Sequence, residues 1–176
     1  MKIVYLHHAQ RDTENGVNQD NALTQFGVQE AELIGEMLRN VPVSSIYHGE
    51  YKRYKLTAEF INRHIKAPLV MDNRLNERCR ERDKGDNFTI RTHSFLDDTI
   101  ARHDNSDVIF CVTSGGNLNE FLNYFHRGEP IEGFKRIQAI GVSPINFEFD
   151  KENNADYIPF TDWTKFNKDF SGGKNK

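Results

Sequence analysis

Two continuous apolar segments constrain the fold of this 176-residue chain more than any other feature. Residues 2–6 and 108–112 are dominated by β-branched and other apolar side chains, with no regular polar alternation. Such runs are typical of central strands that are covered on both faces of a sheet. Shorter strands are predicted over residues 44–47 and 68–71, and the alternating pattern of residues 145–149 predicts a half-exposed strand.

Helical periodicity lies between these strands. Apolar side chains recur at three- and four-residue spacing in four segments: residues 24–39, 50–65, 89–102 and 117–125. Strands that alternate with helices predict an α/β fold, a three-layer α/β/α sandwich with a mostly parallel central sheet. The length predicts a single domain over residues 1–165, followed by a Lys-, Asn- and Gly-rich tail over residues 166–176 that is expected to be flexible.

Charge and composition exclude several classes of partner. The chain has 23 Lys and Arg against 26 Asp and Glu, a net charge of −3, so it is not a cationic protein that binds nucleic acid or membranes by bulk charge. Its longest apolar run is too short to cross a bilayer, and its N-terminus lacks the features of a signal peptide. Two cysteines, Cys79 and Cys111, form no disulfide framework. We therefore expect a cytoplasmic protein without nucleic-acid or membrane partners.

Polar residues gather where the predicted strands end. Residues 7–11 read His-His-Ala-Gln-Arg after the first strand, and residues 114–116 read Ser-Gly-Gly before a helix. Ligands bind at the carboxyl ends of strands in such folds, and helix N-termini and guanidinium groups favour oxyanions. A neutral imidazole is a competent nucleophile toward phosphorus, and a nearby carboxylic acid can protonate the leaving oxygen. The pattern indicates a phosphate site.

At these residues the sequence resembles the histidine phosphatase superfamily, also called the phosphoglycerate mutase-like family. The resemblance rests on motifs that occur in the family's order, at residues 6–10, 23–31, 47–58, 75–77 and 112–116. It implies a phosphoglycerate mutase-like fold. It also implies that His8 is the nucleophile that becomes phosphohistidine, that Arg53 binds phosphate, and that Glu77 is the proton donor. A small phosphorylated substrate or a phosphoprotein is expected, with no cofactor.

The sequence departs from the family pattern at three places, one of which is Gly49-Glu50, where a Ser-Pro pair is expected. His7 stands where an arginine is expected, and Ser114 stands where a second active-site histidine is expected. A lost charge-assisted contact costs about 1.5–3 kcal/mol, and a missing transition-state donor costs about 10²–10³ in rate. Ser114 and the backbone near Gly115 can still donate hydrogen bonds, and Arg11 is a candidate substitute guanidinium. His7 carries positive charge only when protonated, so activity is expected to rise toward acid pH.

Two functional hypotheses follow. The first is a phosphomonoester hydrolase of the histidine phosphatase type, with weak or atypical activity. The second is a catalytically impaired pseudo-phosphatase that binds a phosphorylated ligand or a protein partner. The substitutions at His7 and Ser114 favour the second hypothesis, and the retained His8 and Arg53 favour the first.

Each candidate residue also has a structural interpretation. His8 could be a hydrogen-bonded structural histidine, Arg53 a solvated helix charge, and Glu77 a surface residue of a charged loop. The remaining histidines are scattered without ligand spacing, so no metal site is expected. The sequence predicts neither the particular substrate nor the oligomeric state.

Overall fold

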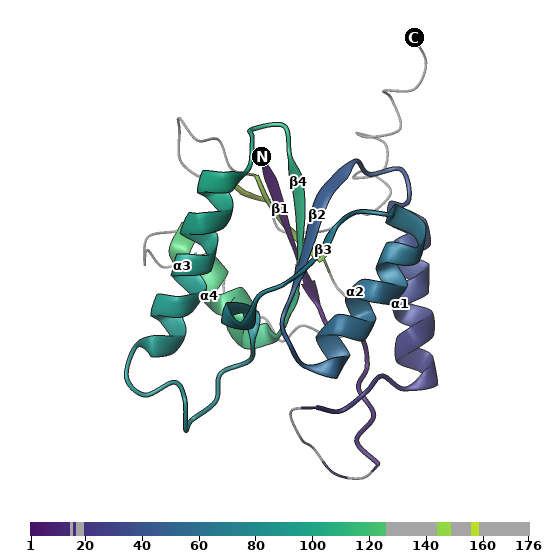
Figure 1. Cartoon of the computed structure of the whole chain (residues 1–176), viewed down its shortest axis with the longest axis horizontal. Helices are drawn as coiled ribbons and strands as arrows, with labels where there is room; N and C mark the ends of the chain where they lie inside the picture. Colours follow the sequence, from purple (N-terminus) through teal and green to yellow (C-terminus); the bar gives the residue numbers. More distant parts are fainter. Residues whose placement is uncertain (15, 17–19, 126–143, 149–155, 159–176) are drawn as a thin grey trace.

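The computed structural model describes residues 1–14, 16, 20–125, 144–148 and 156–158. In this part of the chain a six-stranded sheet has the strand order β3-β2-β4-β1-β5-β6 (Figure 1). The strands are β1 (Lys2–His7), β2 (Val43–His48), β3 (Leu69–Met71), β4 (Val108–Thr113), β5 (Pro144–Glu148) and β6 (Asp156–Ile158). β1 to β4 are mutually parallel, whereas β5 and β6 pair antiparallel. The predicted mostly parallel sheet is confirmed.

Helices cover both faces of this sheet (Figure 1). α1 (Gln25–Leu38) and α2 (Lys52–Ile65) lie on one side, and α3 (Asn87–Arg102) and α4 (Gly115–Phe125) lie on the other. A short 3₁₀ helix, η1 (Asn73–Leu75), follows β3. The predicted α/β/α sandwich is therefore confirmed.

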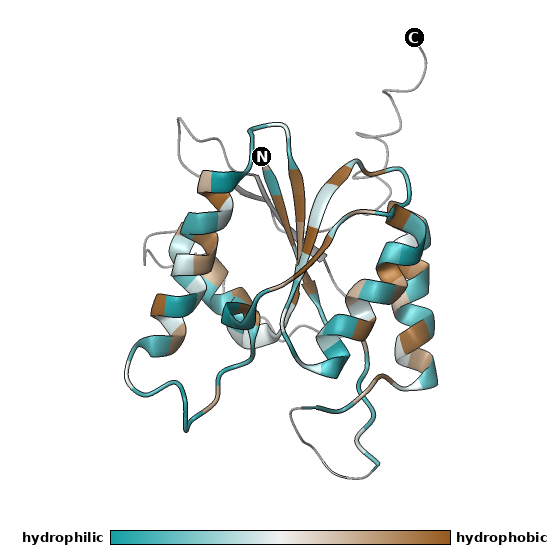
Figure 2. Cartoon of the chain, viewed as in Figure 1, coloured by the Kyte–Doolittle hydropathy of each residue, from teal (hydrophilic) through white to brown (hydrophobic). Residues whose placement is uncertain are grey.

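The two apolar runs are continuous because both faces of the central strands are buried. Alternate residues of β1 enter different cores: Val4 and Leu6 pack with α1 and α2, and Ile3 and Tyr5 pack with α3 and α4. Every residue of β4 is buried. Figure 2 shows the apolar character of the central strands, which lie between the two helical layers. Cys111 is one of these buried residues and is a free thiol.

Element boundaries differ from the prediction in a few places. α4 begins at Gly115, two residues earlier than expected, so the Gly-Gly pair forms its first turn. β5 begins at Pro144, a position where a proline is tolerated because it opens the strand. β6 was not predicted, since its three residues carry no readable alternation. The expected tail, residues 166–176, lies outside the described residues, and the single domain over 1–165 stays a prediction.

Parallel pairing brings the ends of three strands together. His7 of β1 is in register with Thr113 of β4, and His48 of β2 is in register with Val112. His8, Gly49 and Ser114 therefore follow strands that end at the same edge of the sheet. Within the described residues, no helix has the length and apolar character needed to cross a membrane.

Candidate active site

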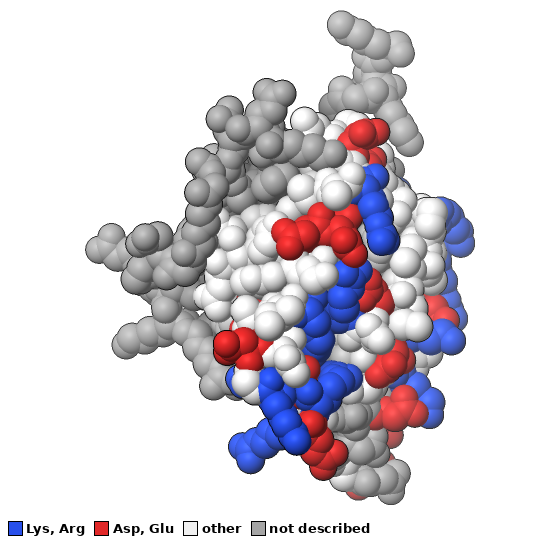
Figure 3. Space-filling view, turned by 60° about the vertical axis from the view of Figure 1, so that its left-hand side comes forward, with Lys and Arg blue, Asp and Glu red and all other residues white. Residues whose placement is uncertain are grey.

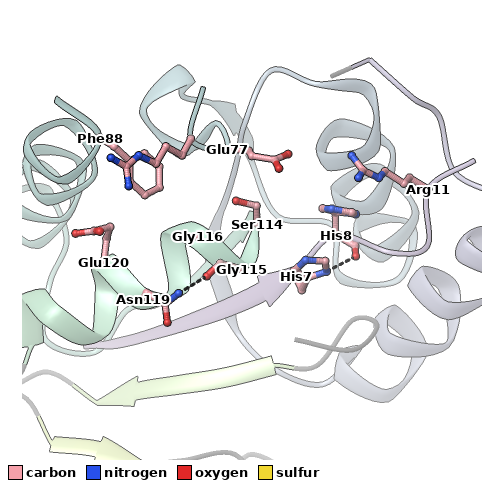
Figure 4. Close-up of a pocket in the computed structure, with 11 residues that line it drawn as sticks. His7, His8, Arg11, Glu77, Phe88, Ser114, Gly115, Gly116, Asn119 and Glu120 are labelled. Atoms are coloured by element: carbon pink, nitrogen blue, oxygen red, sulfur yellow. Dashed lines mark hydrogen bonds between the residues drawn. The ribbon is translucent and has the colours of Figure 1, made fainter. Parts of the chain in front are cut away.

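A cavity of about 500 Å³ opens at this edge of the sheet (Figure 4). His7, His8 and Arg11 lie at one end of it, Phe88, Asn119 and Glu120 lie at the other, and Glu77 and Ser114 lie between them. The remaining lining residues are Arg78, Gly115 and Gly116. The cavity thus brings together six of the seven site residues predicted from the sequence: His7, His8, Arg11, Glu77, Ser114 and Gly115.

His8 has the protonation state of a nucleophile. Its backbone N–H donates to the carbonyl oxygen of Thr113 at 3.0 Å, which ties it to the end of β4. Its Nδ1 lies 2.8 Å from the carbonyl oxygen of Ala9, and a carbonyl only accepts, so Nδ1 carries the hydrogen. Burial, and then the neighbouring His7, lower the pKa of His8 to about 3. The ring is therefore neutral near pH 7, with its lone pair on Nε2.

The backbone that follows His8 is held by α1 and α2. The N–H of Ala9 donates to Oγ1 of Thr57 at 3.0 Å. The carbonyl oxygen of Gln10 accepts the N–H of Thr24 at 3.0 Å, and Oγ1 of Thr24 caps α1 by accepting the N–H of Gly27 at 2.9 Å. A Cβ at Gly27 would lie 2.2 Å from the carbonyl oxygen of Gln10, so this position admits only glycine. The Leu-Thr-x-x-Gly motif therefore fixes the loop that carries the nucleophile.

His7 does not supply the positive charge expected of it. Its Nδ1 donates to the carbonyl oxygen of His8 at 2.8 Å, and the two imidazole rings are 4.2 Å apart. Burial lowers the pKa of His7, because desolvation disfavours the charged ring. A neutral His7 with its hydrogen on Nδ1 has no N–H left for a phosphoryl oxygen. This finding argues against the expectation that His7 gains its charge toward mildly acid pH.

The N-terminus of α4 forms the floor between the two ends of the cavity. Ser114 is buried, and its Oγ donates to Oδ1 of Asn117 at 2.9 Å, so the hydroxyl hydrogen is already engaged. A Cβ at Gly115 would meet no heavy atom within 4 Å, which shows open space above this residue. The first N–H groups of a helix have no intrahelical acceptor and favour an anion. The backbone around Gly115, rather than the Ser114 hydroxyl, is thus the available donor.

Arg53 is fully buried and does not line the cavity. Its guanidinium lies 4.4 Å from the ring centre of Tyr54 and 4.9 Å from that of Tyr51. Its Nη2 donates to the hydroxyl oxygen of Tyr54 at 2.8 Å and to Oε2 of Glu77 at 2.5 Å. The side chain of Glu77 is 45% exposed and lines the cavity. Arg53 therefore reaches the site through Glu77.

A second arginine holds the loop that carries Glu77. Arg91 donates to the carbonyl oxygens of Asn76 at 2.8 Å and of Glu77 at 3.3 Å. It also binds both carboxylate oxygens of Asp83, at 2.9 and 3.0 Å.

Glu50, which replaces the proline of the family motif, lies outside the cavity and accepts from the amide of Asn76 at 2.7 Å.

Two other arginines at the cavity form no ion pair with a described residue. Arg11 and Arg78 both line it, and neither has an ion pair with another described residue. By contrast, Arg74 is paired with Asp72 and Asp98 at 2.7 Å each. Figure 3 shows basic and acidic side chains side by side in the middle and lower part of one face of the molecule. Arg11 and Arg78 are therefore available to anionic groups of a ligand.

The sequence analysis did not single out four of the lining residues: Arg78, Phe88, Asn119 and Glu120. One signal could have found two of them, because Asn119 and Glu120 follow Gly115 and Gly116 by four residues and so share their helix face. Phe88 comes from the start of α3, remote in sequence, and no local pattern marks it. In the described part of the chain, no group of three or more His, Cys, Asp or Glu side chains is arranged to hold a metal ion.

The chain was compared with known protein families and solved structures. Residues 6–87 match the family described as histidine phosphatase superfamily (branch 1). YhfR from Bacillus stearothermophilus superposes with a TM-score of 0.74 and 19% identity, over 90% of this chain and 95% of that chain. A phosphoserine phosphatase mutant from Entamoeba histolytica, in complex with phosphoserine, gives 0.72 and 16%, over 92% and 97%. The protein histidine phosphatase SixA, complexed with tungstate, gives 0.71 and 12%, over 94% and 99%.

No curated protein sequence matches the chain. At these identities the structural matches establish the fold, and they confirm the phosphoglycerate mutase-like architecture that the motifs predicted.

Proposed function

We propose that this chain is a histidine phosphatase, in line with the family match of residues 6–87, and that it hydrolyses phosphomonoesters through a phosphohistidine on His8. The observation that carries this proposal is the state of His8: buried, neutral, with Nδ1 tied to the Ala9 carbonyl, on a cavity that Arg11 also lines. A neutral imidazole on an anion-binding cavity is suited to attack phosphorus.

In the first step Nε2 of His8 attacks phosphorus in line with the ester oxygen. The N–P bond forms while the P–O bond to the leaving group breaks. Arg11 and the backbone N–H groups at the start of α4 hold the phosphoryl oxygens. Glu77 donates a proton to the leaving oxygen, and the alcohol departs.

In the second step water attacks the phosphohistidine. The Glu77 carboxylate takes a proton from that water as the new P–O bond forms and the N–P bond breaks. Inorganic phosphate leaves, His8 returns to its neutral form, and Glu77 is again protonated. No group outside the chain is needed to balance these steps.

The proposal assigns the roles of the two arginines in the family motifs to different residues of this chain. Arg11 takes the direct phosphate contact that His7 no longer offers, whereas Arg53 is a positioning residue that holds Glu77. Because one guanidinium and one imidazole are missing, turnover is expected to be slow. Relatives of the same fold include a phosphatase for a small phosphorylated molecule and one for a phosphoprotein, and a substrate of either class is compatible with the proposal.

Phosphate release from an aryl phosphate, measured beside a His8→Ala variant, tests the function. We expect release by the wild type, none by His8→Ala, and a phosphate adduct on His8 when the protein is trapped without acid. His64→Ala is the matched control, because that histidine pairs with Glu36 away from the cavity. Release by the wild type that does not exceed the His8→Ala background would contradict the proposal. In that case retained phosphate binding would identify the chain as a pseudo-phosphatase.

A further inference from the structure

The end of the cavity opposite His8 contains a carboxylate that the fold does not satisfy. Glu120 lines the cavity, and its side chain is 14% exposed. Its Oε2 is buried and accepts no hydrogen bond from any described residue. A buried polar atom without a partner costs free energy, and native proteins rarely leave one unless a ligand or ion supplies the partner.

His93 does not satisfy this carboxylate. Its Nε2 lies 3.6 Å from Oε2 of Glu120, beyond hydrogen-bond distance. The same nitrogen lies 3.2 Å from the backbone carbonyl oxygen of Glu120, which can only accept, so the N–H of His93 is used there. Glu120 therefore presents the exposed part of its side chain to the cavity, and no described donor lies within hydrogen-bond distance of its Oε2.

Arg78 provides a complementary charge on the same cavity. Its exposed guanidinium has no ion pair with any other described residue, and it also lines a second cavity with Arg80 and Asp83. A guanidinium is a planar fork that matches a carboxylate. The lining of the cavity therefore includes an acidic and a basic side chain that could bind a ligand, together with the Phe88 ring and the Asn119 amide.

Figure 4 places Glu120 and Phe88 at the end away from His8. A phosphomonoester with its phosphorus at His8 directs its leaving group toward them. We propose that this leaving group is a free amino acid, with its ammonium group on Glu120 and its carboxylate on Arg78, and this inference rests on the phosphatase function proposed above. A phosphoprotein does not fit, because its backbone nitrogen and carbonyl are in peptide bonds and carry no charge.

Three phosphomonoesters test the ammonium contact and the carboxylate contact one at a time. O-phosphoserine carries both charges, phosphoethanolamine lacks the carboxylate, and 3-phosphoglycerate has a hydroxyl in place of the ammonium group. We expect kcat/KM for phosphoserine to exceed that for each of the others by about tenfold or more, since each lost contact is charge-assisted. A phosphoserine peptide hydrolysed as fast as free phosphoserine would overturn the proposal.

Two variants assign the contacts to residues. Glu120→Gln keeps the shape of the side chain and should reduce the preference for phosphoserine over 3-phosphoglycerate by about tenfold. Arg78→Met should reduce the preference for phosphoserine over phosphoethanolamine to a similar degree. Glu59→Gln, on the surface of α2 beside Lys55, is the control and should change neither ratio. Preferences that persist in both cavity variants would overturn the proposal.

Failure of this inference can be told apart from failure of the phosphatase function. Hydrolysis of an aryl phosphate that depends on His8, without a preference for phosphoserine, refutes only the inference. If no ester is hydrolysed, calorimetry with the His8→Ala variant still tests it. Phosphoserine should then bind about tenfold more tightly than 3-phosphoglycerate, and equal affinities would refute the proposed site.

Discussion

Arg53 and Glu77 form an ion pair, 2.5 Å between Nη2 and Oε2, and of the two only Glu77 lines the cavity. Arg11 has the opposite arrangement, since it lines the cavity and has no ion pair with a described carboxylate. The arginine that the family motif marks and the arginine that a ligand can contact are therefore different residues. The different roles of the two arginines can be measured in the kinetics of single variants.

Arg11→Met should weaken phosphate binding, whereas Arg53→Met should impair the chemical steps. We expect Arg11→Met to raise KM and the inhibition constant of inorganic phosphate by about tenfold, because a charge-assisted contact is lost. Arg53→Met releases Glu77 from its partner and should lower kcat with a smaller change in KM. Arg63→Met, which removes a surface pair with Glu32, is the control. Equal loss of phosphate affinity in the Arg11 and Arg53 variants would contradict this division.

His7→Arg should increase activity. A neutral His7 whose hydrogen lies on Nδ1 offers no donor to a phosphoryl oxygen, and a guanidinium offers several. Restoring one charge-assisted contact in the transition state is expected to raise kcat/KM by about 10- to 100-fold. Steady-state kinetics from pH 5 to 8 check a second consequence. Burial lowers the pKa of His7. The activities of the wild type and of His7→Asn should therefore change in parallel as the pH passes through 6.5.

The stability of the fold should depend on pH through His8. The pKa of His8 is lowered to about 3 in the folded protein, whereas an unfolded histidine takes up a proton near pH 6.5. Between these values the unfolded state binds the extra proton, so His8 stabilises the fold fully above about pH 6.5 and progressively less as pH falls toward 3. The loss is about 1.4 kcal/mol per pH unit.

Urea denaturation at pH 7 and pH 5 measures this effect. The free energy of unfolding should fall by about 2 kcal/mol more for the wild type than for His8→Asn, which lacks the titrating ring. Parallel losses in the two proteins would mean that His8 is not held neutral by burial.

Gly27→Ala should damage the site from a distance. The added Cβ would lie 2.2 Å from the Gln10 carbonyl oxygen, so either α1 or the loop after His8 must move. We expect a loss of stability of about 1–3 kcal/mol together with a fall in kcat. Gly35→Ala is a matched control, since its Cβ would lie 2.6 Å from the Ile61 carbonyl oxygen within the helical layer. That variant should lose stability and keep its activity per folded molecule, as measured at a temperature where both variants are folded.

The sequence predicted the layers of the fold because strand and helix periods are local properties. Continuous apolar runs identified β1 and β4, and the predicted helical segment 24–39 begins at Thr24, the N-cap of α1. Helix ends were less accurate, since Gly115 and Gly116 are poor helix formers that tertiary context nevertheless places in α4. β6 is specified by pairing with β5, which no local pattern reveals.

The site was predictable where residues follow a strand directly. His8, Ser114 and Gly115 lie on backbone that the sheet positions, so their meeting follows from topology. The location of Arg53 could not be inferred in the same way. A long side chain can point into the cavity or into the core, and the rings of Tyr51 and Tyr54 that hold it inward are recognised only in three dimensions.

The two short stretches of chain that flank residues 13–21 are joined to each other beside the nucleophile. The N–H of Asp12 donates to the Ala22 carbonyl at 2.8 Å, Arg11 bridges Leu23, and Thr24 binds Gln10. Because these contacts fix both ends of the segment, a change in its length is isolated from His8. A peptide inserted between residues 13 and 21 should therefore leave the nucleophile in place.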